Sequence, residues 1–304
     1  MRRLREGLRH LRAGYNSLLK ANEMEETLDL VLFRPLAYLG VRAVEQTRIT
    51  PDQVTLASIV AAVGAALSIA TGTYAGFLWG AALVLLFNVL DCADGMLARV
   101  RGKGSPYGYI LDGLAGYIGT TAILLGIGRA VALRWGNPLL GWSLAVAGGL
   151  SMAWWCSVVD ELRLEWNRRV YGVRQDRAAE LKGLVEAADV WRAEGSHRSE
   201  RFLVGAYLIY VRLWSGRPRA DRFDPREDEI PATSWAESHR SVLRLAVAAG
   251  PTMQLTAIAA ALVLGTPAAV LIAAVTLGNL WGAVVLGCRF AIQRRLLAQI
   301  ATEA

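Results

Sequence analysis

Long runs without a charged side chain dominate the pattern of this sequence. Residues 53–90 contain no charged residue over 38 positions, and residues 245–288 contain none over 44. A turn-forming triplet interrupts each run near its middle, Thr71-Gly72-Thr73 in the first and Gly265-Thr266-Pro267 in the second. Each half therefore has about the 20 residues that a helix needs to cross the hydrocarbon core of a bilayer.

Two further stretches have the same character. Residues 135–159 are uncharged, and residues 105–128 contain a single charge, Asp112. No stretch shows the alternation of a strand, so we expect an all-α integral membrane protein with a six-transmembrane-helix bundle. The alternative, a large soluble helical core, would need several fully apolar helices of about 20 residues. The expected spans are 53–71, 75–98, 106–128, 138–159, 243–264 and 268–288.

The residues before the first span predict structure at the membrane surface. Residues 1–20 have apolar side chains at helical spacing and arginines on the other faces. This pattern indicates an N-terminal interfacial amphipathic helix on an anionic leaflet, although a surface helix docked on protein would show the same spacing. Residues 29–44 are apolar but contain Arg34, Pro35 and Arg42, which favours a second interfacial helix over a full span.

Basic residues are distributed unevenly between the two ends of the predicted spans. Of 33 Lys and Arg, nine precede position 50, fifteen lie in 160–240, and three follow the last span. The opposite face has only Arg129 and Arg134, so we expect a multi-pass protein with both termini cytoplasmic, in the inner membrane if the source is bacterial. Residues 160–240 contain fifteen acidic residues as well as the fifteen basic ones, so this region has no excess positive charge. It also lacks a nucleic-acid-binding motif, so no nucleic-acid partner is expected.

These patterns divide the chain into four regions. The low charge, 19% of residues, and the 54% apolar content argue against a disordered chain. The three Cys show neither paired nor metal-ligand spacing. The expected regions are 1–50 with the amphipathic and interfacial helices, 51–159 with spans one to four, 160–240 as a cytoplasmic insertion, and 241–304 with spans five and six and the C-terminal tail.

Three carboxylates inside the apolar spans are the main chemical signal. Asp91 and Asp94 share a helix face near the end of span two, and Asp112 lies about one and a half turns into span three. An antiparallel pair of spans would bring them together. Buried carboxylates cost several kcal/mol unless they are compensated, and hard divalent cations compensate them best: Mg²⁺, Mn²⁺ or Ca²⁺. Ion coupling in a transporter is the alternative, although no inverted repeat is evident.

The residues beside these carboxylates suit a phosphorylated ligand. Gly95 allows a ligand to approach the backbone, and Ala98 keeps the same helix face open. Arg99 offers a planar fork of donors that fits phosphate. Divalent cations and a guanidinium beside a groove are chemistry for a pyrophosphate.

Together these residues resemble the signature of the CDP-alcohol phosphotransferases, or CDP-alcohol phosphatidyltransferases, which are integral membrane enzymes of phospholipid synthesis. Seven positions match over 22 residues: Asp91, Asp94, Gly95, Ala98, Arg99, Gly108 and Asp112. The resemblance implies a transferase that moves a phosphatidyl or related phosphoryl group from a CDP-linked donor, such as CDP-diacylglycerol, to an alcohol acceptor, and releases CMP. It also implies a homodimer, a two-metal site of Mg²⁺ or Mn²⁺ held by the aspartates, and a cytidine at Gly95, Ala98, Arg99 and Gly108.

One position of the family pattern is not met. The signature ends in an Asp four residues after Asp112, which the family uses as general base, but this chain has Gly116 there. A missing base typically costs about 10²–10⁴ in rate. A divergent active enzyme remains possible if the acceptor ionises unaided or if Asp160 or Glu161 supplies the base. The other interpretation is a silent family member that binds CDP-lipid and metal.

Arginines that follow span four are candidates for an acceptor site. Arg163, Arg168 and Arg169 would bind the phosphate of an acceptor such as inositol phosphate or glycerol phosphate. Alternatively, they are positive-inside residues beside lipid head groups. Two pairs of glycines, Gly76-x-x-x-Gly80 and Gly278-x-x-x-Gly282, permit close helix packing, but such pairs occur in many bundles and are weak support for a homodimer.

Overall fold

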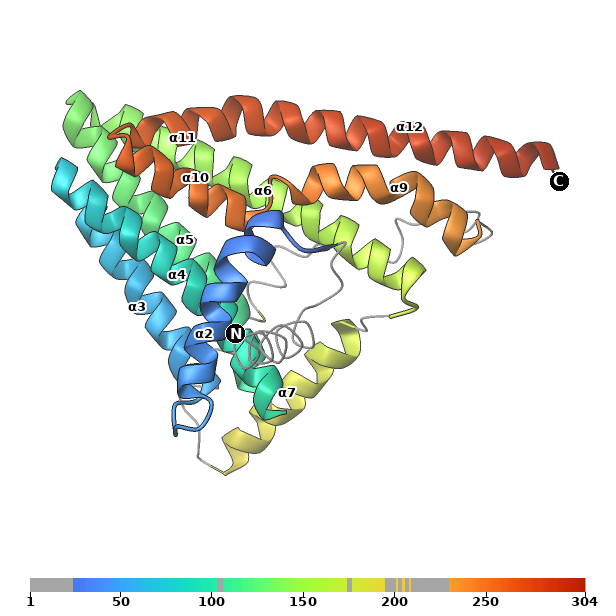
Figure 1. Ribbon diagram of the computed structural model, residues 1–304, viewed down its shortest axis with the longest axis horizontal. Helices are drawn as coiled ribbons and strands as arrows, with labels where there is room; N and C mark the ends of the chain where they lie inside the picture. Colours follow the sequence, from blue (N-terminus) through green and yellow to red (C-terminus); the bar gives the residue numbers. More distant parts are fainter. Residues whose placement is uncertain are drawn as a thin grey trace, which may run out of the picture.

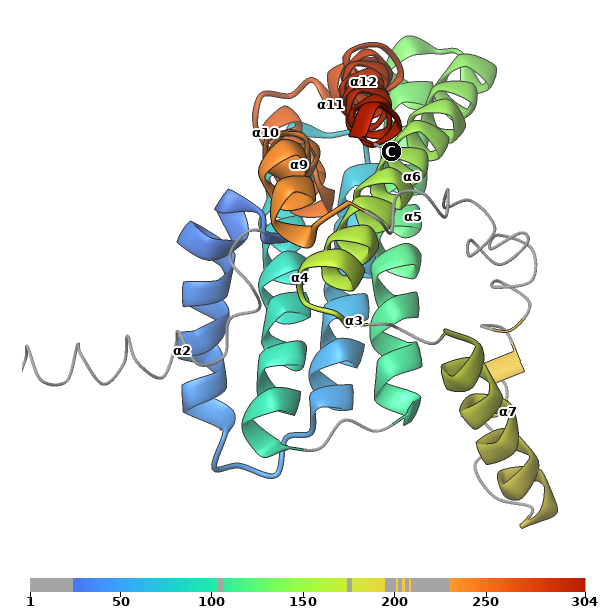
Figure 2. The same ribbon diagram turned by 90° about the vertical axis from the view of Figure 1, so that its right-hand side faces the viewer.

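The structure is a computed structural model that describes residues 24–102, 106–173, 177–194, 201, 204–205, 208 and 230–303. Helices joined by short turns make up this part of the chain, and Figures 1 and 2 show their arrangement. The helices are α2 (Arg34–Val44), α3 (Pro51–Ala70), α4 (Tyr74–Arg101), α5 (Pro106–Trp135), α6 (Pro138–Val170), α7 (Arg177–Ala193), α9 (Ala232–Val247), α10 (Pro251–Val263), α11 (Pro267–Ala273) and α12 (Asn279–Glu303). π-helical turns at Asp29–Phe33 and Ala274–Gly278 precede α2 and α12.

Among the described residues, six helical segments are long and apolar enough to cross a membrane. They are α3, α4, α5 from Gly113 onward, α6, α9 with α10, and α11 with α12. The prediction of an all-α protein with six spans is therefore confirmed. Helix α6 continues beyond the predicted span 138–159 to Val170, because charge alone does not stop a helix and the sequence has no Gly or Pro from 160 until Gly172.

Local signals in the sequence set the helix starts. Thr50 accepts the N–H of Gln53 at 3.2 Å, and the Gln53 side chain accepts the N–H of Thr50 at 3.0 Å, which forms a capping box before α3. Thr73 caps α4 in the same way through the N–H of Gly76 at 3.1 Å. Gly102 ends α4 with a φ of 60°, a backbone conformation that glycine adopts most easily.

Helix α3 packs lengthwise against both α4 and α5, whereas α4 and α5 touch each other over a much shorter stretch. Figure 2 shows these helices side by side. Small residues allow the close approach: a Cβ added at Gly126 of α5 would lie 2.5 Å from the carbonyl oxygen of Ala66 in α3. In the described part of the chain, spans two and three therefore contact each other as expected, but α3 makes the longer contact with each of them.

The glycine pairs singled out in the sequence pack inside the chain. A Cβ at Gly80 would lie 2.4 Å from Cγ1 of Ile69 in α3. A Cβ at Gly282 in α12 would lie 2.6 Å from the ring of Trp154 in α6. These contacts account for both residues without a second copy of the chain, so they lend no support to the predicted homodimer.

The fifth span is broken between α9 and α10. Helix α9 ends at Val247, and α10 begins at Pro251 after a turn through Gly250. Residues 24–29, which lead into the π-helical turn at Asp29, lie against this break, because Glu26 accepts the N–H of Met253 at 2.9 Å. Helix α2 continues from there along α4, as Figure 1 shows.

The surface elements are described only in part. The expected interfacial helix over 29–44 is present as the π-helical turn and α2, and α7 lies within the predicted insertion 160–240. The amphipathic helix expected over 1–20 lies outside the described residues. The region boundaries and the placement of the insertion in the cytoplasm stay predictions.

Candidate functional site

Asp94 is the more enclosed of the two predicted metal ligands whose side chains the structure describes. Its side chain lies on α4 in a residue that is only 3% exposed. One carboxylate oxygen accepts the hydroxyl of Thr55 on α3 at 2.6 Å, and the other accepts the backbone N–H of Gly95. Both donors fix the direction of the carboxylate, which is how neighbouring groups orient a metal ligand.

The neighbouring motif residues share one side of α4. Asp91 lies one turn before Asp94 and is half-buried, and Ala98 lies one turn after it. Gly95 faces Arg99, since a Cβ added at Gly95 would lie 3.7 Å from Nη1 of that guanidinium. A ligand that approaches the backbone at Gly95 therefore meets the donor fork of Arg99.

A packed layer of three helices places these residues relative to Asp112. A Cβ at Gly119 of α5 would lie 2.6 Å from the ring of Phe87 in α4 and 3.1 Å from Cβ of Ala62 in α3, so the three helices meet at this level. The same faces of these helices carry three polar residues two turns farther toward the α4–α5 connection. This is about 10 Å along each helix from the packed layer. They are Thr55, Asp94 and Asp112.

The side chain of Asp112 and the surroundings of Gly108 lie outside what the structure describes. Both residues belong to the first turns of α5. Among the described side chains, no three His, Cys, Asp or Glu gather in a group that could hold a metal ion. The three-carboxylate site therefore rests on the helix positions and stays a prediction.

Gly116 has room for a larger side chain. Among the described atoms, a Cβ added there would meet none within 4 Å, and the same holds for Gly113 one turn earlier. Gly116 lies between Asp112 and Gly119, near the face of α5 that meets α3 and α4. The backbone thus accommodates an acid at the position where the family pattern has its base.

Comparison with known proteins identifies the family of this chain. Residues 48–172 match the family model described as CDP-alcohol phosphatidyltransferase. A phosphatidylinositol phosphate synthase of Cutibacterium acnes is 30% identical over 188 residues, which cover 59% of this chain and 80% of that protein. The chain belongs to the CDP-alcohol phosphatidyltransferase family. The matched region contains all seven motif positions and the helices that carry them.

Two mycobacterial members of this family give shorter matches. The phosphatidylinositol phosphate synthase of Mycobacteroides abscessus is 35% identical over 106 residues, which cover 35% of this chain and 46% of that protein. That of Mycolicibacterium smegmatis is 36% identical over 109 residues, 36% of this chain and 46% of that protein. The chain thus spans about half the length of these two relatives.

Members of this family generally depend on a metal ion. The donors on α4 fit a hard cation, because Asp91 and Asp94 supply carboxylate oxygens and the only sulfur between them, that of Cys92, lies against Asp29 instead.

The three candidate acceptor arginines point to different sides of α6. Successive residues of a helix are about 100° apart, so Arg163, Arg168 and Arg169 leave the helix in different directions. The side chain of Arg169 is 6% exposed, with Nε 3.6 Å from Glu165 and its guanidinium over the ring of Trp235. Arg163 is 25% exposed and lies against residues 24–26. Arg163 therefore becomes the strongest of the three candidates.

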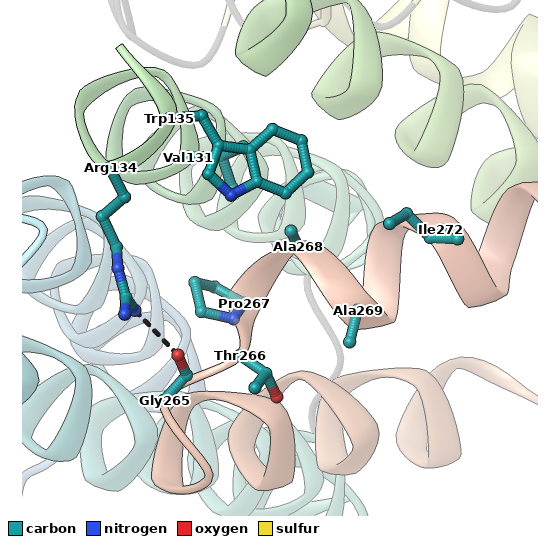
Figure 3. A pocket seen from close by; sticks show the side chains of 9 residues that line it. All are labelled: Val131, Arg134, Trp135, Gly265, Thr266, Pro267, Ala268, Ala269 and Ile272. Atoms are coloured by element: carbon teal, nitrogen blue, oxygen red, sulfur yellow. Dashed lines mark hydrogen bonds between the residues drawn. The ribbon is translucent and has the colours of Figure 1, made fainter. Parts of the chain in front are cut away.

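A separate cavity of about 450 Å³ lies at the other end of α5, about 33 Å along the helix from Asp112. Figure 3 shows its apolar lining, to which Trp135 and Ile272 contribute, with Arg134 at one side. The guanidinium of Arg134 donates to the carbonyl oxygen of Gly265 at 2.7 Å. The distance from the motif separates this cavity from the candidate site.

Sequence reasoning missed three polar residues that contact the helices of the site. Thr55 was visible only as one hydroxyl among many in an apolar run. Glu26 and Asp29 lie in a charged segment that looks solvent-exposed in sequence, yet they are 3% and 9% exposed. The sequence of this segment alone does not predict its burial, because the break between α9 and α10 that covers it is formed by residues far along the chain.

Proposed function

We propose that this chain transfers a phosphatidyl or related substituted phosphoryl group from a CDP-linked donor, such as CDP-diacylglycerol, to an alcohol and releases CMP. Its membership of the family supports this reaction type. One observation carries the proposal. Thr55, Asp94 and Asp112 lie at the same height along α3, α4 and α5, two turns from the layer in which these helices pack together. This layer would hold the polar end of a lipid-linked nucleotide while the acyl chains stay among the apolar helices.

Asp91, Asp94 and Asp112 would hold the metal, with Mg²⁺ or Mn²⁺ as the expected ions. When bound, such ions neutralise charge on a pyrophosphate and assist departure of CMP. Gly95, Ala98, Arg99 and Gly108 would receive the cytidine and its phosphates. The position of Arg99 beside Gly95 supports this role, since the guanidinium lies next to a backbone that carries no side chain.

The acceptor is proposed to be a phosphorylated polyol. Phosphatidylinositol phosphate synthases are among the chain's relatives, and Arg163 offers a partly exposed guanidinium next to the bundle. Position 116 carries no acid, so another residue would have to act as the base. Asp160 is a better candidate for this role than Glu161. Its side chain is 52% exposed beside Arg163, whereas Glu161 lies 3.5 Å from Arg289 on the α12 side.

A silent family member is the second candidate function, and Gly116 is the observation that favours it. Such a protein would bind the CDP-linked lipid with metal but release no CMP. The homodimer, the bilayer orientation and the location in an inner membrane remain proposals with either function.

Restoration of the acid is the experiment that separates these functions. Purified protein is given CDP-diacylglycerol with Mg²⁺ or Mn²⁺ and a panel of inositol phosphate, glycerol phosphate and unphosphorylated alcohols, and CMP is measured. An active enzyme releases CMP with one acceptor, and Asp91→Ala reduces release to background. Gly116→Asp raises the rate, by up to about 10²–10⁴ if a missing base limits it.

Gly113→Asp is the matched control, because it places the same acid at another open position of the same helix. Equal stimulation by both variants would show a general charge effect and contradict a base at position 116. If neither the native chain nor Gly116→Asp releases CMP with any acceptor, the silent function is supported instead.

A further inference from the structure

The N-terminal segment 24–29 inserts a carboxylate into the break of the fifth span. Glu26 is 3% exposed and accepts the N–H of Met253, in the first turn of α10, at 2.9 Å. Gly250 makes this possible, since a Cβ at that position would lie 2.2 Å from Oε1 of Glu26. A carboxylate at a helix N-terminus pairs with exposed N–H groups and the positive end of the helix dipole, so this contact holds the segment in place.

The same segment reaches the metal motif on α4. Asp29 accepts the hydroxyl of Thr252 at 2.8 Å, and Sγ of Cys92 lies 3.9 Å from the same carboxylate oxygen. Cys92 is the residue directly after Asp91 in the motif. Residues 24–29 therefore contact α4 at the motif and α10 at its start.

The third contact of this segment is Arg163 on α6. Nε of Arg163 donates to the carbonyl oxygen of Met24 at 3.0 Å, and Nη2 lies 3.6 Å from Oε1 of Glu26. Nη1 lies 3.8 Å from Asp160 on the same helix. These partners constrain a long side chain that still exposes 25% of its surface.

We propose that Glu26 is a positioning residue that holds Arg163 ready to bind the phosphate of the acceptor. This inference rests on the proposed function, because it assigns the acceptor side of that same site. The segment that fixes Arg163 also contacts the residue beside Asp91, so the acceptor arginine and the metal motif are tied to one short piece of backbone. An arginine ordered before binding loses less conformational entropy when the phosphate arrives.

Glu26→Gln is the informative variant. The amide oxygen of Gln still accepts the N–H of Met253, so the helix contact is kept, while the charge beside Arg163 is lost. At about pH 8, where a native carboxylate with a pKa near 7 is ionised, we expect the KM for a phosphorylated acceptor to rise about tenfold. The KM for CDP-diacylglycerol and kcat should stay close to native values, and the thermal unfolding midpoint should not fall, because a neutral side chain avoids the burial of a charge. Glu45→Gln is the control, because it removes an acid paired with Arg42 on α2, away from Arg163.

Direct binding gives a second measurement that does not depend on turnover. Calorimetric titration with inositol 1-phosphate and glycerol 3-phosphate should show about tenfold weaker binding to Glu26→Gln, with CDP binding unchanged. If the native chain releases no CMP but this difference appears, the proposed reaction fails while the inference stands.

Three results would overturn the inference. The first is a native acceptor KM and native phosphate binding in Glu26→Gln. The second is an equal loss of donor and acceptor affinity with a lower unfolding midpoint, which would show a structural role. The third is transfer to unphosphorylated alcohols only, without binding of either phosphate monoester, which would leave the proposed reaction intact.

Discussion

At the scale of single residues, Asp94 shows how a carboxylate is made tolerable inside an apolar bundle. Its oxygens accept one hydroxyl and one backbone N–H, from Thr55 and Gly95. The motif spacing predicted Asp94 as a ligand, but the partner Thr55 lies 39 residues away in sequence. Only the packing of α3 against α4 brings the two together.

Thr55→Val tests whether this hydroxyl supports metal binding. The substitution keeps the side-chain shape and removes the donor, so Asp94 loses its fixed direction. Loss of such a supporting contact typically costs about 10–100-fold in metal affinity or activity. We therefore expect the Mg²⁺ concentration for half-maximal CMP release to rise by about tenfold, with most of kcat recovered at saturating Mg²⁺.

Ser58→Ala provides the comparison, because the buried hydroxyl of Ser58 lies on the same helix but donates to the backbone of Thr55 at 2.7 Å. A similar Mg²⁺ shift in both variants would attribute the effect to α3 as a whole. An unchanged Mg²⁺ dependence in Thr55→Val would show that Asp94 does not need this partner.

At the scale of elements, the break between α9 and α10 is closed by a segment from the other end of the chain. Burial raises the pKa of Glu26 from its ordinary value of 4.5 to about 7. Neighbouring Asp29 acts in the same direction, while the N–H of Met253 and Arg163 oppose it. Desolvation therefore outweighs the favourable partners, as expected for a carboxyl this enclosed.

The raised pKa predicts that stability depends on pH. Below about 4.5, Glu26 is neutral in both the folded and unfolded states. Between 4.5 and about 7 the unfolded state ionises first, so the free energy of unfolding falls as pH rises, by about 3 kcal/mol over the whole interval. Above 7 this contribution is constant.

Thermal unfolding in detergent at several pH values checks this expectation. Relative to native protein, Glu26→Gln should flatten the decline of the unfolding midpoint between about pH 4.5 and 7. The difference between the two proteins is the informative quantity, because other acids titrate in the same interval. Parallel curves for the two proteins would contradict a shifted Glu26.

At the scale of the whole molecule, the two arginines at the sparsely charged end have internal partners. Arg129 donates to the carbonyl oxygen of Ala70 at the end of α3, and Arg134 donates to that of Gly265 after α10. Guanidinium groups are favourable at the ends of helices, where carbonyl oxygens lack partners. These hydrogen bonds explain why two positive charges lie at this end of the bundle. The predicted orientation in the membrane therefore depends on the distribution of the remaining basic residues.

Cysteine labelling tests that orientation. In a Cys288→Ser background, which removes the exposed native thiol, Arg48→Cys lies between α2 and α3 and Leu264→Cys lies in the turn after α10. A membrane-impermeant maleimide added to intact cells should label Leu264→Cys and spare Arg48→Cys. The opposite pattern would reverse the proposed topology.

The sequence by itself determined the helical class, the six spans, and the motif residues on α4 and α5. These features depend on local composition and spacing, because lipid admits only segments that satisfy their own backbone hydrogen bonds. Tertiary structure decided that α3 joins α4 and α5, that Thr55 supports Asp94, and that Glu26 enters the break before α10 to meet Arg163. These contacts join residues distant along the chain, and their energies depend on burial and direction, which no single segment encodes.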